Sequence, residues 1–343
     1  MDILTLTRPD DCHLHLRDGP ALAVVLADSA RRFARAVVMP NLRPPVTTVA
    51  AALAYGERIR AALPAGVDFT PLLTLYLTEA TPAAELRAAK AAGLLGVKLY
   101  PAGATTHSDA GVRRLEAVYP LLETMQDIDL PLLVHGEVTD PKVDVFDREA
   151  VFVERHLAPV VARFPALRVV LEHVTTREGV EFVRAARPGV AASITPQHLS
   201  MNRGALFEGG LRPHHYCLPV LKREEHRAAV LAAAISGDPK FFLGTDSAPH
   251  PQTAKESACG CAGIYSAHGG IELYAEAFDA AGALDKLDAF ASRHGADFYR
   301  LPRNRGTLTL RRAPTPVPDS LPFGDERLVP LRAGGQLAWQ IVA

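Results

Sequence analysis

Near its start the chain reads Asp11-Cys12-His13-Leu14-His15-Leu16-Arg17-Asp18. Side chains alternate between the two faces of a β-strand, so His13 and His15 point to the same side and could reach one metal ion. Cys12, Leu14 and Leu16 then share the opposite face and pack. Taken alone, the two histidines fit two interpretations: polar residues on a solvated edge strand, or metal ligands.

The overall composition favours a large apolar core and a small polar substrate. The 343 residues are 48% hydrophobic, and 37 Lys and Arg residues nearly cancel 38 Asp and Glu residues, which leaves a formal net charge of −1. This balance offers no electrostatic reason to expect a nucleic acid or a membrane as partner. We expect one domain over residues 1–343, because α/β barrels of this length occur as single domains.

The cysteine content indicates a reducing compartment. Four cysteines are too few for a disulfide framework in a chain of this length; they are Cys12, Cys217, Cys259 and Cys261. Cys259 and Cys261 are more closely spaced than the usual zinc pair and no second pair exists, so we favour a loop with buried thiols. The sequence shows no signal region and no apolar run long enough to cross a bilayer, so we expect a cytoplasmic protein.

Short apolar runs alternate with helical patterns along most of the chain. After the first strand, which carries His13, the predicted strands are Ala36–Met39, Asp68–Leu77, Gly96–Tyr100, Leu130–His135, Leu167–His173, Val190–Thr195 and Lys240–Asp246. The predicted helices are Pro20–Ala34, Thr48–Leu63, Pro82–Ala92, Ala110–Met125, Asp147–Phe164, Thr176–Ala186, Arg223–Ile235, Ile271–Ala281 and Asp285–His294. Helix boundaries follow apolar spacing and possible capping residues.

Eight such units predict an α/β fold of the TIM type, a closed (β/α)8 barrel with a parallel sheet. The competing fold is an open doubly wound sheet, which normally has a Gly-rich phosphate turn after its first strand. Leu16–Pro20 does not supply that turn. From Leu301 onward the chain is Pro-rich and has no helical period, so residues 301–343 are predicted to be an irregular extension with short strands packed on the barrel.

Ionisable residues fall in or at the ends of the predicted strands, and the carboxyl ends of barrel strands meet at one mouth, where catalytic groups lie. These residues are His13, His15, Lys98, His135, His173 and Asp246. Each histidine and the aspartate could separately be structural. Lys98 is harder to explain in that way, because an ammonium group in a buried strand is costly unless it is paired, deprotonated or modified.

Four imidazoles and one carboxylate suit Zn²⁺ or a similar divalent ion, and they exceed what one tetrahedral catalytic site needs. Two ions about 3.5–4 Å apart would use all of them. Such a pair needs a bridging anion. The ammonium group of Lys98 has no lone pair, but carboxylation by CO₂ would turn it into a carbamate with one oxygen for each ion.

These motifs resemble the amidohydrolase superfamily and, within it, closely resemble the dihydroorotase family of the shorter, single-function bacterial type. The matching segments are Asp11–Asp18, Met39–Asn41, Gly96–Thr106, Val134–Glu137, Leu171–His173, Thr195–His198, Gly244–His250 and Lys255–Gly263. The resemblance implies a reversible, zinc-dependent cyclisation of N-carbamoyl-L-aspartate to L-dihydroorotate in pyrimidine synthesis, and a homodimer.

The resemblance also implies roles for the residues at the mouth. One zinc would be held by His13, His15, carboxylated Lys98 and Asp246, and the other by Lys98, His135 and His173. Asp246 would take a proton from the attacking water and pass it to the leaving ring nitrogen.

Further residues are implied to bind substrate. Arg17, Asn41 and His250 would contact its carboxylate, since a guanidinium group suits bidentate pairing. Backbone groups near Leu218 and Ala262 would contact the ring edge, and His15 and His135 would also touch the substrate. Thr105 and Thr106 lie in the small-residue loop Ala102–His107 and would face the ligand on a closing lid.

Two other functions remain open at the level of sequence. A cyclic-imide or hydantoin hydrolase would share the metals and the barrel but not the carboxylate-binding residues. A catalytically inactive barrel that serves as a scaffold for another pyrimidine enzyme would typically lack metal ligands, and none is missing here. Metal content and activity on substrates without a carboxylate separate these alternatives.

Overall fold

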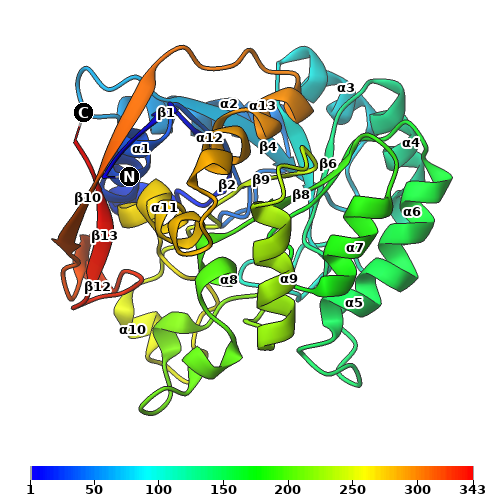
Figure 1. Ribbon diagram of the computed structural model, residues 1–343. Coiled ribbons are helices and arrows are strands. Elements are labelled where there is room, and N and C mark those ends of the chain that lie inside the picture. Colours follow the sequence, from blue (N-terminus) through cyan, green and yellow to red (C-terminus); the bar gives the residue numbers. More distant parts are fainter. Residues whose placement is uncertain (1, 343) are drawn as a thin grey trace.

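The computed structural model describes residues 2–342, and an eight-stranded parallel sheet lies at its centre, in the order β2-β3-β4-β5-β6-β7-β8-β9 (Figure 1). The strands are β2 Asp10–Leu14, β3 Arg35–Val38, β4 Thr70–Tyr76, β5 Gly96–Leu99, β6 Leu132–Val134, β7 Val169–Leu171, β8 Val190–Ile194 and β9 Phe241–Leu243. This sheet confirms the predicted (β/α)8 barrel.

The barrel closes between its first and last strands. The amide of Asp246 donates to the carbonyl of His13 over 2.8 Å, and the amide of His15 donates to the carbonyl of Ser247 over 3.1 Å. Asp11 strengthens this seam, since its buried carboxylate accepts from the amide of Thr245 at 2.9 Å and from its hydroxyl at 2.6 Å. The segment that carries the two histidines is therefore tied directly to the segment that carries Asp246.

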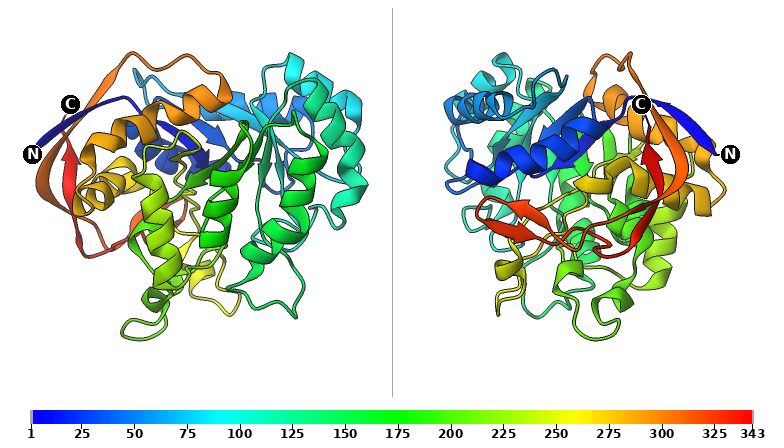
Figure 2. Two further views of the ribbon diagram at one scale, coloured as in Figure 1. Left: turned by 45° about the vertical axis from the view of Figure 1, so that its right-hand side comes forward. Right: turned by 90° about the vertical axis from the view of Figure 1, so that its left-hand side faces the viewer.

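Helices surround the sheet on its outer side, and the short helices α8 Pro196–Ser200 and α10 Gln252–Lys255 lie in the loops that follow β8 and β9 (Figures 1 and 2). The others are α1 Leu22–Arg32, α2 Val49–Ala61, α3 Ala83–Ala91, α4 Tyr119–Asp127, α5 Arg148–Phe152, α6 Ala158–Arg163, α7 Arg177–Ala185, α9 Glu224–Ala234, α11 Gly270–Ala280, α12 Leu284–Ser292 and α13 His294–Tyr299. Thr48 and Thr176 cap α2 and α7 through their hydroxyl oxygens.

Short 3₁₀ helices and one π-helical turn complete the helical structure. They are η1 Gly19–Ala21, η2 Leu115–Val118, the π-helical η3 Val153–Leu157, η4 Arg203–Leu206, η5 Pro213–His215 and η6 Ala267–Gly269. The prediction of a helix from Ala110 was wrong for its first turn. Gly111 and Val112 run beside the loop after β5, where the amide of Val112 donates to the carbonyl of Tyr100 over 2.8 Å, so helical structure begins only at Leu115.

The barrel interior is apolar towards the amino ends of the strands. Cys12 packs there with Leu133, Val170 and Phe242, and Leu14 belongs instead to the outer core between strands and helices. The prediction that Cys12 and Leu14 share one face was therefore wrong. The pairing of β2 with β3 shifts register between Asp11 and Leu14, and this irregularity breaks the strict alternation of side chains.

The C-terminal extension is more regular than predicted. β10 Thr307–Pro316 is ten residues long and pairs with β1 Ile3–Thr7 and β13 Gln336–Ile341, while β11 Leu321–Phe323 and β12 Glu326–Leu328 form a hairpin. Figure 1 shows β1, β10 and β13 together at one side of the barrel. Because both ends of the chain contribute to one sheet, we propose that residues 1–343 form a single domain. Among the described residues, no helix is long and apolar enough to cross a membrane.

Candidate metal centre

Residues far apart in the sequence converge at the carboxyl end of the barrel. All six predicted metal ligands are buried, with exposed fractions of at most 8%: His13, His15, Lys98, His135, His173 and Asp246. All except Lys98 line one small cavity at this end. The structure therefore brings the predicted ligand set together.

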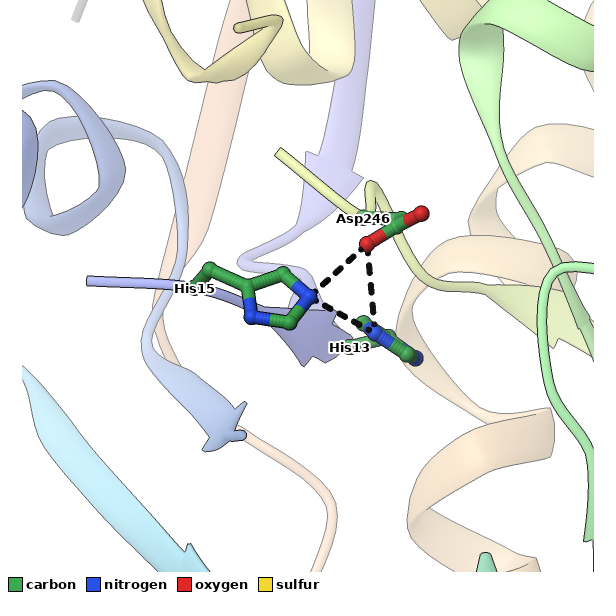
Figure 3. A group of neighbouring side chains, drawn as sticks. All are labelled: His13, His15 and Asp246. Carbon is green, nitrogen blue, oxygen red and sulfur yellow. Dashed lines mark hydrogen bonds and ion pairs between the residues drawn. The ribbon is translucent and has the colours of Figure 1, made fainter. Parts of the chain in front are cut away.

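Three of these side chains form a compact group of donor atoms (Figure 3). Nε2 of His13 lies 3.4 Å from Nε2 of His15, and Oδ1 of Asp246 lies 3.3 Å and 3.0 Å from these two atoms. Two imidazole nitrogens and a carboxylate oxygen are typical zinc ligands. One metal ion could therefore be held by this group.

The local backbone conformation orients the side chains of the candidate ligands. His173 and Asp246 both adopt left-handed conformations, with φ of 45° and 44°. Such conformations are unfavourable for residues other than glycine and persist where neighbouring bonds hold them. Here the amide of His173 donates to Ser193 Oγ over 2.8 Å, and the amide of Asp246 is held in the barrel seam. At Gly244 a Cβ atom would lie 3.0 Å from the Cβ of His13, so glycine leaves the space that His13 needs.

Glu172 is a member of this centre that the sequence interpretation missed. It is fully buried, its Oε2 accepts from Nζ of Lys98, and the same oxygen lies 3.1 Å from Nδ1 of His13. The signal in the sequence was an acidic residue between the apolar strand β7 and the predicted ligand His173. Burial lowers the pKa of Lys98, although the carboxylate of Glu172 opposes that effect.

His135 and His173 lie on the other side of this group. The two rings have centroids 4.8 Å apart, and the ring of His173 is 5.1 Å from that of His13. Among the described residues, Nδ1 of His173 is buried without a hydrogen-bond partner. A second group of donor atoms close enough for one ion consists of His13, Glu172 and His173. The donors at this end therefore exceed those needed for one ion.

The charges of the first group are set by burial and by its carboxylates. Burial alone disfavours a charged imidazole, but Glu172 and Asp246 raise the pKa of His13 to about 9. Burial lowers the pKa of His15 to about 4. Although burial raises the pKa of Asp246, the neighbouring histidines hold it well below its usual value. Asp246 therefore remains an anion that attracts a cation to this point.

The predicted carboxylate-binding residues lie beside the metal group. Nη2 of Arg17 is 3.0 Å from Nε2 of His250, and Nε of Arg17 donates to the carbonyl of Pro249 over 3.0 Å. Oδ1 of Asn41 lies 2.8 Å from Nδ1 of His15, on the side of the ring opposite Nε2, which is 3.0 Å from Oδ1 of Asp246. Asn41 therefore orients a predicted ligand in addition to lining the cavity.

Leu218 and Ala262 also line the cavity, and both belong to long loops that buried polar side chains hold in place. His198, for which the sequence suggested no role, lies between Thr195 Oγ1, 2.7 Å from its Nδ1, and the carbonyl of Pro219, 3.0 Å from its Nε2. Nζ of Lys255 donates to the carbonyls of Tyr216, Cys261 and Gly263. These bonds position the walls of the cavity.

The predicted lid residues Thr105 and Thr106 lie over the cavity. The hydroxyl of Thr106 donates to the carbonyl of Ala262 over 3.2 Å, and Nδ2 of Asn41 donates to the carbonyl of Thr106 over 3.3 Å. The cavity beneath them is only about 20 Å³, which is room for about one water molecule. This arrangement of the cavity walls therefore leaves no room for an organic substrate.

Comparisons with known proteins agree with this geometry. The model of the amidohydrolase family matches residues 10–314. A dihydroorotase of Laribacter hongkongensis is 66% identical over 343 residues, which cover 99% of each chain. The crystal structure of a dihydroorotase from Campylobacter jejuni has 36% identity and a TM-score of 0.91, and covers 99% of this chain and 98% of that chain. The crystal structure of a dihydroorotase from Saccharomyces cerevisiae, in complex with 5-fluoroorotic acid, has 30% identity and a TM-score of 0.90. The match covers 100% of this chain and 99% of that chain.

Proposed function

This chain belongs to the amidohydrolase family, and we propose that it interconverts N-carbamoyl-L-aspartate and L-dihydroorotate at a centre of two zinc ions. Dihydroorotase activity, a step of pyrimidine synthesis, follows from full-length identity of 66% to a dihydroorotase. The observation that carries the chemistry is the convergence of six buried ligand candidates at the carboxyl end of one barrel.

The donor set fits two zinc ions. His13, His15 and Asp246 would hold the first ion, His135 and His173 the second, and carboxylated Lys98 both. Lys98 supports this assignment because burial lowers its pKa, and only the neutral amine can react with CO₂ to form a carbamate. Its present partner, Glu172, would have to turn away from the carbamate, because two anions repel each other.

Asp246 would transfer the proton during opening of the ring. When bound, the two ions would polarise the ring carbonyl and make water a stronger nucleophile near neutral pH. Among the described residues, Asp246 is the one carboxylate that contacts both His13 and His15, and its Oδ1 lies 3.3 Å and 3.0 Å from their Nε2 atoms. From this place the carboxylate would accept the proton of the attacking water and pass it to the ring nitrogen that leaves. In the direction of ring closure the same transfers run in reverse.

Arg17, Asn41 and His250 would bind the substrate carboxylate. Among the described residues that line the cavity, Arg17 is the one arginine, and its guanidinium group suits a carboxylate. Burial lowers the pKa of His250 to about 2, so that residue is a neutral hydrogen-bonding partner. The relative from Saccharomyces cerevisiae bound 5-fluoroorotic acid, which is itself a carboxylic acid. Leu218 and Ala262 would contact the ring edge, and His15 and His135 would lie against the substrate.

The decisive test is hydrolysis of L-dihydroorotate by the purified protein with and without a chelator. We expect about two zinc ions per chain, nearly complete loss of activity after chelation, and recovery when Zn²⁺ is added. Activity on hydantoin or dihydrouracil, which lack the carboxylate, should be weak. Strong activity on those compounds would instead support the cyclic-imide hydrolase, and a metal-free, inactive protein would support the scaffold.

We propose that Thr105 and Thr106 act as a lid. Replacing both with alanine removes two hydroxyl groups at the cavity. If each hydroxyl contributes a hydrogen bond of about 1 kcal/mol to the bound transition state, kcat/KM for dihydroorotate should fall roughly 30-fold. The matched control is Thr5→Ala with Thr309→Ala, because these two hydroxyls bond each other on the exposed C-terminal sheet. Equal steady-state constants for the lid variant and the wild type would contradict the proposal.

We also propose that the protein works as a homodimer in the cytoplasm. All four cysteines are free, which suits a reducing compartment. Cys259 is exposed and Cys261 is only partly buried, so the prediction of a loop with buried thiols was wrong. Both cysteines lie in the loop after α10, and the carbonyl groups of Cys261 and Gly263 accept from the buried Nζ of Lys255. Sedimentation analysis would test the dimer.

A further inference from the structure

A third carboxylate, besides those of Asp246 and Glu172, approaches the proposed metal centre from the segment that follows β6. Glu137 follows His135 by two residues, its side chain is 1% exposed, and its Oε2 lies 2.8 Å from Nε2 of His135. Gly136 between them makes this approach possible, because a Cβ atom there would lie 2.5 Å from Cδ1 of Leu171. Glu137 is not one of the proposed zinc ligands, and nothing in the mechanism above uses it.

This contact decides which nitrogen of His135 carries a proton. A carboxylate oxygen only accepts hydrogen bonds, so Nε2 of His135 donates and Nδ1 keeps its lone pair. His15 differs because both of its ring nitrogens have an oxygen partner, Asn41 Oδ1 at Nδ1 and Asp246 Oδ1 at Nε2. The histidines of the centre are therefore not equivalent in their hydrogen bonding.

We propose that Glu137 is a positioning residue that makes His135 an Nδ1 ligand of the second metal ion by holding the ring proton on Nε2. This inference rests on the two-metal centre proposed above. Partners of this kind fix the orientation of a ligating imidazole and raise its basicity, and their loss typically weakens metal binding about 10- to 100-fold. Asn41 fulfils the equivalent task for His15 at the first ion.

The test compares two substitutions by titrating the metal-free protein with Zn²⁺ against a competing chelator. Glu137→Leu removes the acceptor and should weaken the second zinc site about 10- to 100-fold while the first site keeps its affinity. Glu137→Gln can still accept through its amide oxygen, so its second site should lie closer to the wild type. The control is Glu272→Gln, because Glu272 is equally a buried acid but pairs with Arg32 outside the cavity.

A second readout does not depend on bound metal. In the metal-free protein with ¹⁵N-labelled histidine, the ring of His135 should show a protonated Nε2 and an unprotonated Nδ1, and Glu137→Leu should convert it to a mixture of tautomers. A proton on Nδ1 in the wild type, or unchanged affinity of both zinc sites in Glu137→Leu, would overturn the inference. If the wild type bound no zinc and did not hydrolyse dihydroorotate, the proposed function itself would fail.

Discussion

Replacing Lys98 with methionine is expected to lower the free energy of unfolding of the metal-free protein by about 3 kcal/mol. Removal of one member of a buried ion pair typically costs about 3–5 kcal/mol, because the other charge is left unpaired in the interior. Glu172 would lose the amine of Lys98 but keep Nδ1 of His13 at 3.1 Å, so the lower end of that range applies. Chemical denaturation followed by circular dichroism measures the change.

The double variant Lys98→Met with Glu172→Gln separates two contributions to the lost stability, the unpaired charge of Glu172 and the changed packing around residue 98. It removes the unpaired charge, so it should be more stable than Lys98→Met alone. Both variants should be inactive, since neither can form the bridging carbamate. A single variant as stable as the wild type would show that Glu172 does not depend on Lys98, and an active one would show that the carbamate is not needed.

Replacing Asp246 with asparagine is expected to reduce kcat about 1000-fold in both directions of the reaction. Proton transfer by a positioned side chain contributes about 10²- to 10⁴-fold, and an amide cannot accept the proton. The amide oxygen could still reach the point where His13 and His15 meet, so some metal should be retained at the first site. Steady-state kinetics together with zinc analysis of the same preparation separates these two effects.

Asp18→Asn is the matched control for this substitution. Asp18 belongs to the same motif as His13 and His15, but it forms an exposed ion pair with Arg58 at the surface. Exposed pairs contribute little to stability, so zinc content and kcat should both remain at wild-type values. A similar loss of kcat in both variants would contradict a specific role for Asp246, as would an Asp246→Asn enzyme that keeps full activity.

The sequence alone was sufficient to predict the barrel and the convergence of the six candidate metal ligands, although it did not reveal Glu172. Periodic apolar runs are local properties, and each predicted strand of the barrel was found within a few residues of its predicted position. Because parallel strands end at one mouth, the positions of His135, His173 and Asp246 at strand ends also predicted that they would converge. No knowledge of side-chain contacts was needed for that step.

Tertiary structure alone decided how those residues are held. The pairing of Glu172 with Lys98, of Glu137 with His135 and of Asn41 with His15 depends on side-chain directions that a sequence pattern does not specify. The irregular pairing of β2 likewise turns Cys12 inward, against the alternation expected of an ideal strand. The periodicity of a sequence describes one element at a time, whereas these contacts form only when the whole barrel closes.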